Sequence, residues 1–228
     1  MPDALTLVHV TLPPRQQSAG VPLLLLLHGV GSNEHDLIQL APYLDPRFFV
    51  VSARAPITLA PGMYAWFEVQ LDPVRPIINP QQAESSHEKL LTFIDKAIAT
   101  YRIDPLRVHL MGFSQGAIMS FSVGLTHPEK IAGIVAMSGR VLPETAPHIA
   151  APEALRDLPI FVAHGTEDQV LPIHHGRAAR ELLQRLPVAL TYREYPMGHQ
   201  ISDQSLADIA GWLTQRLDEP PRPQRNRR

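Results

Sequence analysis

Near-continuous apolar runs of strand length recur along the chain, and they restrict its fold more than any other feature of the sequence. Strands buried on both faces of a parallel sheet show this pattern, whereas half-exposed strands alternate apolar and polar residues. Amphipathic patterns fill the intervals, so the order of elements predicts an α/β fold with a mostly parallel, doubly wound sheet and helices on both faces. The runs are Leu23–Leu27, Phe48–Val51, Val108–Phe113, Ile131–Met137 and Ile160–Ala163.

Two further strands and five helices complete this prediction. Leu5–Leu12 alternates loosely, which is typical of an antiparallel edge strand, and Leu190–Tyr195 would be the last strand. The clearest helical pattern is Glu84–Tyr101, whose apolar residues fall on one stripe. The other expected helices are Glu34–Leu44, capped by Ser32 or Asn33, then Gln115–Leu125, His174–Leu186 and Asp203–Leu217.

The length and composition fit a single domain. A chain of 228 residues with 45% hydrophobic residues can bury a sizeable core, but a second domain would be cramped. We expect one domain over residues 1–217 and a disordered tail over residues 218–228, which is rich in proline and arginine. The proline-rich stretch Ala55–Pro80 is too long for a simple connection and indicates a functional loop region.

Several classes of function are excluded by composition. The net charge of -2 gives no electrostatic reason to expect a nucleic-acid partner, and the absence of cysteine removes disulfides, thiolate metal sites and a cysteine nucleophile. The apolar run Val21–Leu27 is too short to span a bilayer, and the N-terminus lacks the pattern of a signal peptide. We therefore expect a soluble, cytoplasmic protein without stable membrane insertion.

The segment Gly112–Gly116 has the form Gly-x-Ser-x-Gly, with Ser114 at its centre. The pattern alone is weak, but here a strand runs into it and a helix follows, which is the setting of a nucleophile elbow. Such a tight turn forces the serine into a sparsely populated backbone conformation and crowds the positions two before and two after it. Glycines at these positions relieve the crowding and expose the hydroxyl above a helix N-terminus.

A serine hydroxyl needs a base, and the base needs an orienting acid. The chain order serine, acid, histidine suggests Asp168, just after strand Ile160–Ala163, and His199, just after Leu190–Tyr195. All three residues then follow the carboxyl ends of strands, where sites form in open α/β sheets. Glu167 is the competing acid; we prefer Asp168 because the run Asp-x-Val-Leu-Pro anchors it at the turn. The rival bases are His28, His164 and the pair His174 and His175.

An oxyanion hole requires two convergent N–H donors. One would come from Gln115, the residue after the nucleophile, and the other from the glycine-rich loop after an early strand, where Val30 lies between Gly29 and Gly31. Taken by itself, that loop could be only a strand-to-helix turn. The sequence contains no Walker lysine motif and no histidine or acidic spacing typical of a metal site.

These segments together resemble the phospholipase/carboxylesterase family of α/β-hydrolases, which includes acyl-protein thioesterases and small bacterial carboxylesterases. The resemblance implies a core fold without a cap domain, hydrolysis of carboxylic esters or thioesters, no cofactor, and the same triad and oxyanion pair. It covers about residues 5–217, and Gly-Phe-Ser-Gln-Gly is specific to the group. Ala117-Ile118 departs from the commoner pair of small residues there. The matching segments are Leu27–Leu37, Trp66-Phe67, Gly112–Ala117, His164–Asp168 and Gly198-His199.

The expected partner is a small-molecule or lipid-like ester with a short to medium acyl chain, and a homodimer is left open. An acyl-protein thioesterase or lysophospholipase activity and a catalytically inactive binding protein are the alternatives. We expect an apolar wall for the acyl chain in the proline-rich region, although the same side chains could simply pack that loop onto the core. The wall would comprise Trp66, Phe67, Leu71, Val74 and Ile77, with Val141 and Leu142.

Overall fold

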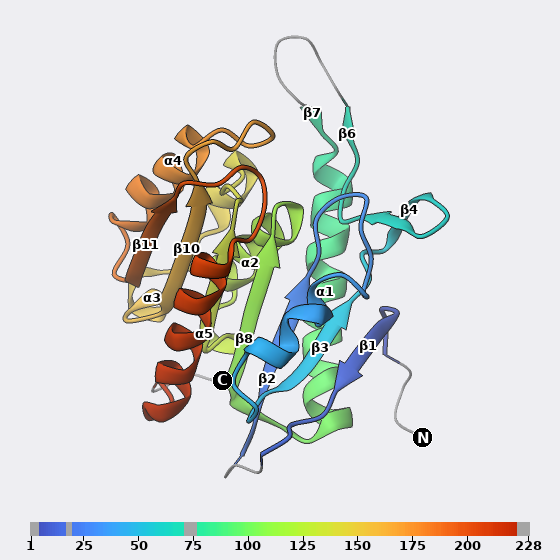
Figure 1. The fold of residues 1–228 in the computed structure, drawn as a ribbon, viewed down its shortest axis with the longest axis vertical. Coiled ribbons are helices and arrows are strands. Elements are labelled where there is room, and N and C mark those ends of the chain that lie inside the picture. The colour runs from blue at the N-terminus through green and yellow to red at the C-terminus, as the bar shows by residue number, and fades with distance from the viewer. Residues whose placement is uncertain (1–4, 17–19, 71–76, 223–228) are drawn as a thin grey trace.

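The computed structural model describes residues 5–16, 20–70 and 77–222, and its centre is a seven-stranded sheet (Figure 1). The strand order is β1-β3-β2-β8-β9-β10-β11. Strand β1 is antiparallel to β3, and every other neighbouring pair is parallel, as the sequence predicts. The strands are β1 (His9–Leu12), β2 (Val21–Leu27), β3 (Phe49–Ala53), β8 (Ile103–Phe113), β9 (Gly133–Met137), β10 (Pro159–Gly165) and β11 (Ala189–Tyr195).

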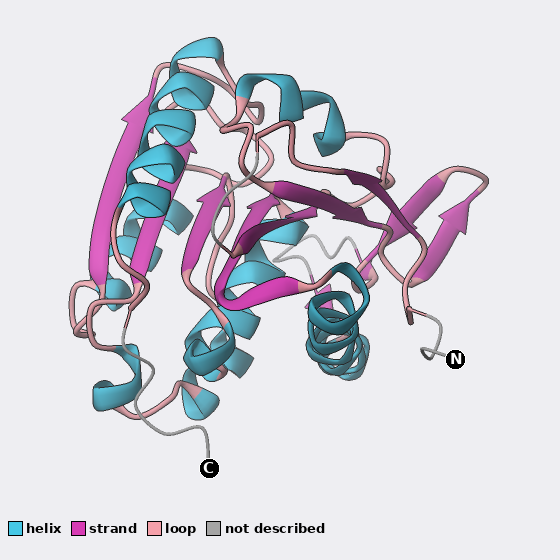
Figure 2. Cartoon of the chain, turned by 90° about the horizontal axis from the view of Figure 1, so that it is seen from below, coloured by secondary structure: helices cyan, strands magenta, loops and turns pink. Residues whose placement is uncertain are grey.

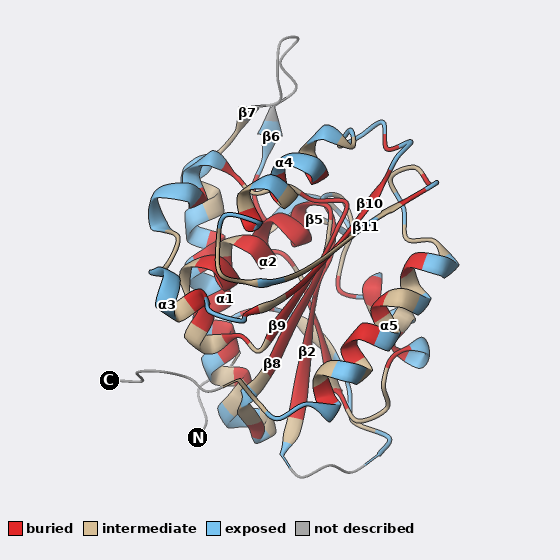
Figure 3. Cartoon of the chain, turned by 90° about the vertical axis from the view of Figure 1, so that its left-hand side faces the viewer, coloured by how far each residue is buried: buried red, intermediate tan, exposed pale blue. Residues whose placement is uncertain are grey.

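Helices cover both faces of this sheet (Figure 2). One face packs against α1 (Pro80–Tyr101), α2 (Gln115–Thr126) and α4 (His174–Leu183), and the other packs against α5 (Asp203–Asp218) and the 3₁₀ helix η1 (Leu37–Tyr43). Side chains of β2 alternate between the two cores, and Figure 3 shows the central strands buried along most of their length. Burial on both faces explains the unbroken apolar runs. Short helices complete the chain: η2 (Pro128–Lys130), η3 (Pro143–His148) and α3 (Pro152–Leu155).

The proline-rich stretch contains two small antiparallel pairs outside the main sheet. Strands β4 (Ile57–Ala60) and β5 (Met63–Ala65) form a hairpin, and β6 (Val69–Gln70) pairs with β7 (Ile77–Ile78). The hairpin reaches the loop after β2, because Tyr64 exchanges backbone hydrogen bonds of 2.8 and 2.9 Å with Gly31 and Ser32. The described part of the proline-rich stretch is therefore ordered and supports the loop after β2.

Several predicted boundaries were wrong for local reasons. Residues 34–44 form no α-helix: η1 begins at Leu37, contains Pro42, which lacks an N–H, and has no side-chain cap from Ser32 or Asn33. Helix α1 begins earlier, at Pro80, because the Asn79 side chain accepts a hydrogen bond from the Gln82 N–H. The edge strand is shorter than expected and starts at His9.

Residues 218–222, the first part of the predicted tail, are among the described residues. Asp218 is the last residue of α5, and Arg222 donates hydrogen bonds to the backbone carbonyls of Pro128, Ile131 and Ala154. Residues 223–228 of the predicted tail lie outside the described residues. Within the described ranges, no helix is both long enough and apolar enough to cross a bilayer.

A buried ion pair fixes the loop after β2 to the neighbouring strand. Glu34, whose side chain is 3% exposed, accepts two hydrogen bonds from Arg54 at the end of β3. The Arg54 guanidinium also lies 4.4 Å from the centre of the Tyr64 ring. The hydrogen bonds from Arg54 lower the pKa of Glu34 to about 2. The pair therefore ties together the β2 loop, β3 and the β4–β5 hairpin.

This ion pair predicts a specific loss of stability in acid. A carboxyl group whose pKa is lower in the folded state stabilises the fold above its unfolded pKa, and this contribution disappears as pH falls from about 4.5 to about 2. Because Arg54 is partly exposed and water screens the pair, we expect the contribution to be about 1–2 kcal/mol. Urea unfolding of wild type and Glu34→Gln at pH 6 and pH 2.5 measures it.

The free energies of unfolding should differ by that amount at pH 6, and most of this difference should disappear at pH 2.5, which is close to the folded-state pKa of about 2. Other carboxyl groups titrate in the same range, so only the difference between the two proteins is informative. Glu153→Gln, at an exposed position, is the control and should track wild type at both values. An equal deficit of Glu34→Gln at both pH values would contradict the prediction.

Candidate active site

Ser114 lies in a strained turn between β8 and α2. Its φ and ψ angles are 54° and -115°, and its N–H donates to the Met137 carbonyl at 2.8 Å. A Cβ at Gly112 would collide with the carbonyl oxygen of Gly116, so the crowding predicted across this turn is present. The turn directs Ser114 to the carboxyl edge of the sheet, where 6% of the surface of this residue is exposed to solvent.

Three side chains distant in sequence meet at this edge. His199, in the turn after β11, has its Nε2 atom 2.9 Å from Ser114 Oγ and its Nδ1 atom 2.7 Å from Asp168 Oδ2. The Phe113 ring packs against the His199 ring with their centres 4.9 Å apart. The structure thus brings together all three predicted residues in a continuous line of hydrogen-bonding distances.

The acid in this arrangement is Asp168, and Glu167 is exposed to solvent instead. The second carboxylate oxygen of Asp168 accepts the N–H groups of Val170 and Leu171 at 2.9 and 2.8 Å, so the Asp-x-Val-Leu turn anchors it. The side chain of Asp168 is fully buried. A Cβ at Gly165 would collide with the Met197 carbonyl, so this glycine lets the aspartate loop and the histidine loop lie against each other.

The rival histidines have other partners. His28 is fully buried, and its Nε2 accepts the Ala55 N–H at 3.0 Å, which leaves Nδ1 to donate to the Gly29 carbonyl. Burial lowers the pKa of His28, in keeping with this neutral form. His164 is equally buried, and its Nε2 lies 2.7 Å from the Leu171 carbonyl oxygen and 3.6 Å from Asp168 Oδ2. These two imidazoles hold loops of the site.

His174 and His175 stack on each other at the start of α4, with ring centres 4.1 Å apart. Burial lowers the pKa of His175 to about 4. Neither of them makes a hydrogen bond to Ser114 or Asp168, so His199 is the histidine that the fold places against the serine.

The two predicted oxyanion donors lie next to the serine. Gln115 is the first residue of α2, so its N–H has no partner inside the helix, and Val30 follows Gly29 in the loop after β2. A Cβ built on Gly29 would lie 3.4 Å from the Ser114 Cβ, which shows how closely the loop approaches. Within the described ranges, neither the Val30 nor the Gln115 N–H donates to a protein acceptor. Both are therefore free to bind a ligand oxygen.

The side chain of Gln115 has a function that the sequence did not reveal. Its Oε1 atom accepts the Trp66 N–H at 2.7 Å, and its Nε2 atom donates to the Phe67 carbonyl at 2.6 Å. The Trp66 indole N–H in turn donates to the His28 carbonyl at 3.0 Å. The elbow, the β2 loop and the proline-rich stretch are thus joined by one buried network.

This network corrects part of the predicted acyl-binding wall. Trp66 and Phe67 are 0% and 1% exposed and belong to the main core, so they pack the loop onto the sheet and offer no surface to a ligand. Leu71 and Val74 lie outside the described residues, as does the side chain of Ile77, whose backbone forms β7. Leu142 is buried in the core, and Val141 packs beside it.

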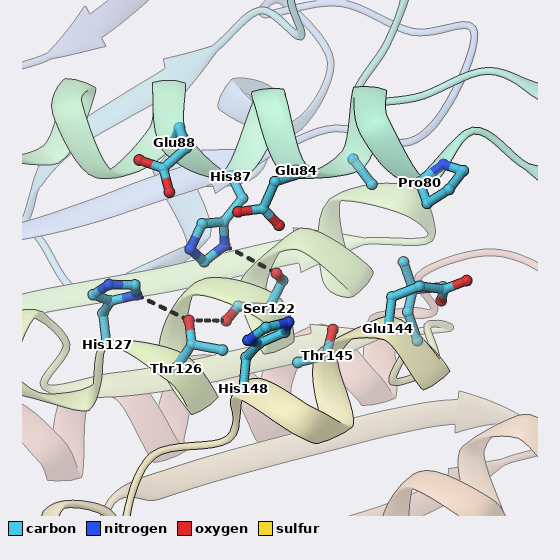
Figure 4. Close-up of a pocket in the computed structure, with 12 residues that line it drawn as sticks. Pro80, Glu84, His87, Glu88, Ser122, Thr126, His127, Glu144, Thr145 and His148 are labelled. Carbon is cyan, nitrogen blue, oxygen red and sulfur yellow. Dashed lines mark hydrogen bonds between the residues drawn. The ribbon is translucent and has the colours of Figure 1, made fainter.

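A pocket of about 330 Å³ lies between α1, α2 and η3, and Leu142 is one of the residues that line it (Figure 4). Its lining mixes polar and apolar side chains and includes His87, His127 and His148, but it contains none of Ser114, Asp168 or His199. The described residues contain no group of three histidine, cysteine, aspartate or glutamate side chains arranged to hold a metal ion. The geometry described above, not this pocket, is the candidate active site.

The comparisons with known proteins agree with this site. The family model described as phospholipase/carboxylesterase matches residues 10–217. The chain is 28% identical to acyl-protein thioesterase 1 of Gibberella zeae, over 87% of this chain and 91% of that protein. It is 32% identical to carboxylesterase SOBER1 of Arabidopsis thaliana, over 71% of this chain and 73% of the relative.

A solved structure is also similar across nearly the whole fold. The carboxylesterase of Bacillus cereus superposes with a TM-score of 0.79 and is 27% identical, covering 92% of this chain and 94% of that one. No cap domain is inserted in the described part of the sheet-and-helix core. The chain therefore belongs to the phospholipase/carboxylesterase family of α/β-hydrolases and is a carboxylic ester hydrolase.

Proposed function

We propose that the chain cleaves carboxylic esters through a covalent acyl-enzyme on Ser114, with His199 as general base and Asp168 as the orienting acid. The observation that carries this proposal is the line from Asp168 Oδ2 through His199 to Ser114 Oγ, with separations of 2.7 and 2.9 Å. Each separation is short enough for a hydrogen bond, and together they would let the hydroxyl proton pass to the imidazole.

The first step is attack of Ser114 Oγ on the ester carbonyl. His199 Nε2 takes the hydroxyl proton, and Asp168 stabilises the resulting imidazolium through Nδ1. The N–H groups of Val30 and Gln115 bind the developing oxyanion at the N-terminus of α2; loss of one such donor typically costs about 2.7–4 kcal/mol. The imidazolium then protonates the departing alcohol or thiol.

Hydrolysis of the acyl-enzyme repeats these steps with water as the nucleophile. His199 removes a proton from the water molecule, and the second oxyanion forms in the same place. Collapse of that intermediate releases the acid and returns the proton to Ser114. Because Asp168 is fully buried while the His199 side chain is 16% exposed, water can reach the imidazole without hydrating the carboxylate.

The proposal extends to the acyl chain and the leaving group of the substrate. We propose that the substrates carry short to medium acyl chains, because the described part of the core has no cap to enclose a long one. We also propose that the reaction takes place in the cytoplasm, which the cysteine-free sequence permits. A thioester on an acylated protein is the second candidate, because relatives from several fungi are named acyl-protein thioesterase 1. Both substrates use the same chemistry up to the protonation of the leaving atom.

A variant series tests the triad. Ser114→Ala and Asp168→Asn should lower kcat for 4-nitrophenyl butyrate by roughly 10⁴-fold, because one lacks the nucleophile and the other fails to orient the imidazole. Ser114→Ala should also abolish labelling by a fluorophosphonate probe. Glu167→Gln changes the adjacent, exposed carboxylate and should keep activity within about twofold. Labelling of Ser114→Ala, or equal losses at positions 167 and 168, would refute the assignment.

A substrate panel separates the two leaving groups. The 4-nitrophenyl esters from acetate to palmitate should show kcat/KM highest at four to eight carbons, about tenfold above the longest, if the site is open. The thioesters of the same acids with a short thiol give the second arm, and an S-palmitoylated peptide the third. Preference for the palmitoyl peptide over every short ester would replace the first candidate with the second.

A further inference from the structure

Arg140 follows Gly139, a residue that lies close to the Ser114 backbone. Strand β9 lies between β8 and β10, and the backbone continues from its end through Ser138 and Gly139 to Arg140. The Ser138 N–H donates to the Ala163 carbonyl at 2.8 Å, which holds this turn level with the elbow and the aspartate loop. A Cβ at Gly139 would lie 3.4 Å from the Ser114 carbonyl oxygen. Arg140 is therefore the next residue after a glycine that lies close to the Ser114 backbone.

The guanidinium of Arg140 has no protein partner within the described ranges. The residue is half-buried, its Nε atom is enclosed without a hydrogen bond, and it forms no ion pair with a described carboxylate. Burial lowers the pKa of Arg140, as it does for Arg222. However, Arg222 donates to several backbone carbonyls, so its desolvation is offset and that of Arg140 is not.

The charges around Arg140 leave its positive charge uncompensated. The acidic side chain that faces it is Glu144 on η3, which is exposed and stays beyond ion-pair distance. Arg140 also contributes to the low pKa of His175 at the start of α4, so the two residues influence each other electrostatically. The Nε atoms of four other arginines are also enclosed without a hydrogen bond, but each of those guanidinium groups contacts a carboxylate, a carbonyl or an aromatic ring elsewhere: Arg107, Arg180, Arg216 and Arg222. Arg140 makes no such contact with a described residue, and a half-buried guanidinium without one suggests a missing ligand.

We propose that Arg140 binds an anionic group of the substrate, a carboxylate or a phosphate, so that the enzyme selects esters that carry such a group near the scissile bond. The inference rests on the function proposed above for Ser114. A guanidinium presents a planar fork of donors that matches two oxygens of a carboxylate or phosphate. An anionic substrate would supply the acceptors that the protein does not, and the half-buried position would strengthen the pairing relative to water.

Matched substrates measure this selectivity. On the acyl side, the 4-nitrophenyl monoester of adipic acid is compared with 4-nitrophenyl hexanoate, which lacks the terminal carboxylate. On the alcohol side, 2-(hexanoyloxy)ethyl phosphate is compared with 2-hydroxyethyl hexanoate. The readout is the ratio of kcat/KM for the anionic ester to that for its neutral partner. We expect a ratio of about 10 or more in at least one arm, and the arm identifies which half of the ester carries the anion.

Variants assign this ratio to one side chain. Arg140→Gln should reduce it at least about tenfold, and Arg140→Lys, which keeps the charge without the fork, should fall between. Arg185→Gln removes an exposed arginine that follows the C-cap of α4 and should retain the wild-type ratio. Raising the salt concentration to about 1 M should lower the wild-type ratio but not that of Arg140→Gln.

Wild-type ratios near or below one in both arms, or equal loss of both substrates in Arg140→Gln, would overturn the proposal. Failure of the triad is recognised separately. If the neutral esters are not cleaved, or Ser114→Ala cleaves them as well as wild type does, the proposed function itself fails. If the neutral esters are cleaved through Ser114 but substitution of Arg140 leaves the ratio of kcat/KM values unchanged, only the inference on Arg140 fails.

Discussion

The arrangement of the site depends on backbone packing directly against backbone at the start of α2. A Cβ at Gly116 would collide with the carbonyl oxygen of Leu27, so the first turn of the helix lies against the end of β2 with no side chain between them. Strands β2 and β8 are neighbours, and the chain passes from β2 to β3 on one side before it returns to β8 on the other. This reversal is a topological switch point, where loops diverge and leave a crevice. Because the contact brings the start of α2 close to the loop after β2, we propose that the N–H groups of Val30 and Gln115 serve the same oxyanion.

The sheet could be predicted because its signal is strong and local. Complete burial of β2 on both faces demands an apolar residue at every position, and the sequence supplies five consecutive leucines from Leu23 to Leu27. Helix boundaries carry a weaker signal, since one residue can decide them. Asn79 acts as a cap five residues before the expected start of α1, and Pro42 converts an apparent amphipathic helix into a 3₁₀ turn. The order in residues 218–222 was not predictable from composition, because it depends on carbonyls that Arg222 reaches across about 70 to 90 residues of chain.

The candidate site shows the same division between local and long-range signals. The positions of Ser114, Asp168 and His199 follow from where strands end, so the sequence predicted which residues come together. The network of Gln115, Trp66 and His28 could not be predicted, because nothing in a side chain reveals which distant backbone it will bind. An aromatic pair in a long loop predicts an acyl wall and a core anchor equally well. Only the exposure of Trp66 and Phe67, which is almost nil, decides in favour of the anchor.

The charged side chains at the carboxyl edge of the sheet differ in how fully they are paired with other groups. This difference connects the proposed chemistry to the proposed specificity. Asp168 is fully satisfied: two backbone N–H groups hold one oxygen, and His199 lies against the other. Glu34 is satisfied by Arg54, which stiffens the loop that carries Val30. Desolvated charges of this kind are stable in a fold only when they are paired. Arg140, one residue after the glycine that lies close to the Ser114 backbone, departs from that rule. Under the proposal made above, this unpaired charge weakens the free protein slightly but would pair strongly with an anionic substrate that excludes water, so that binding the substrate would also select it.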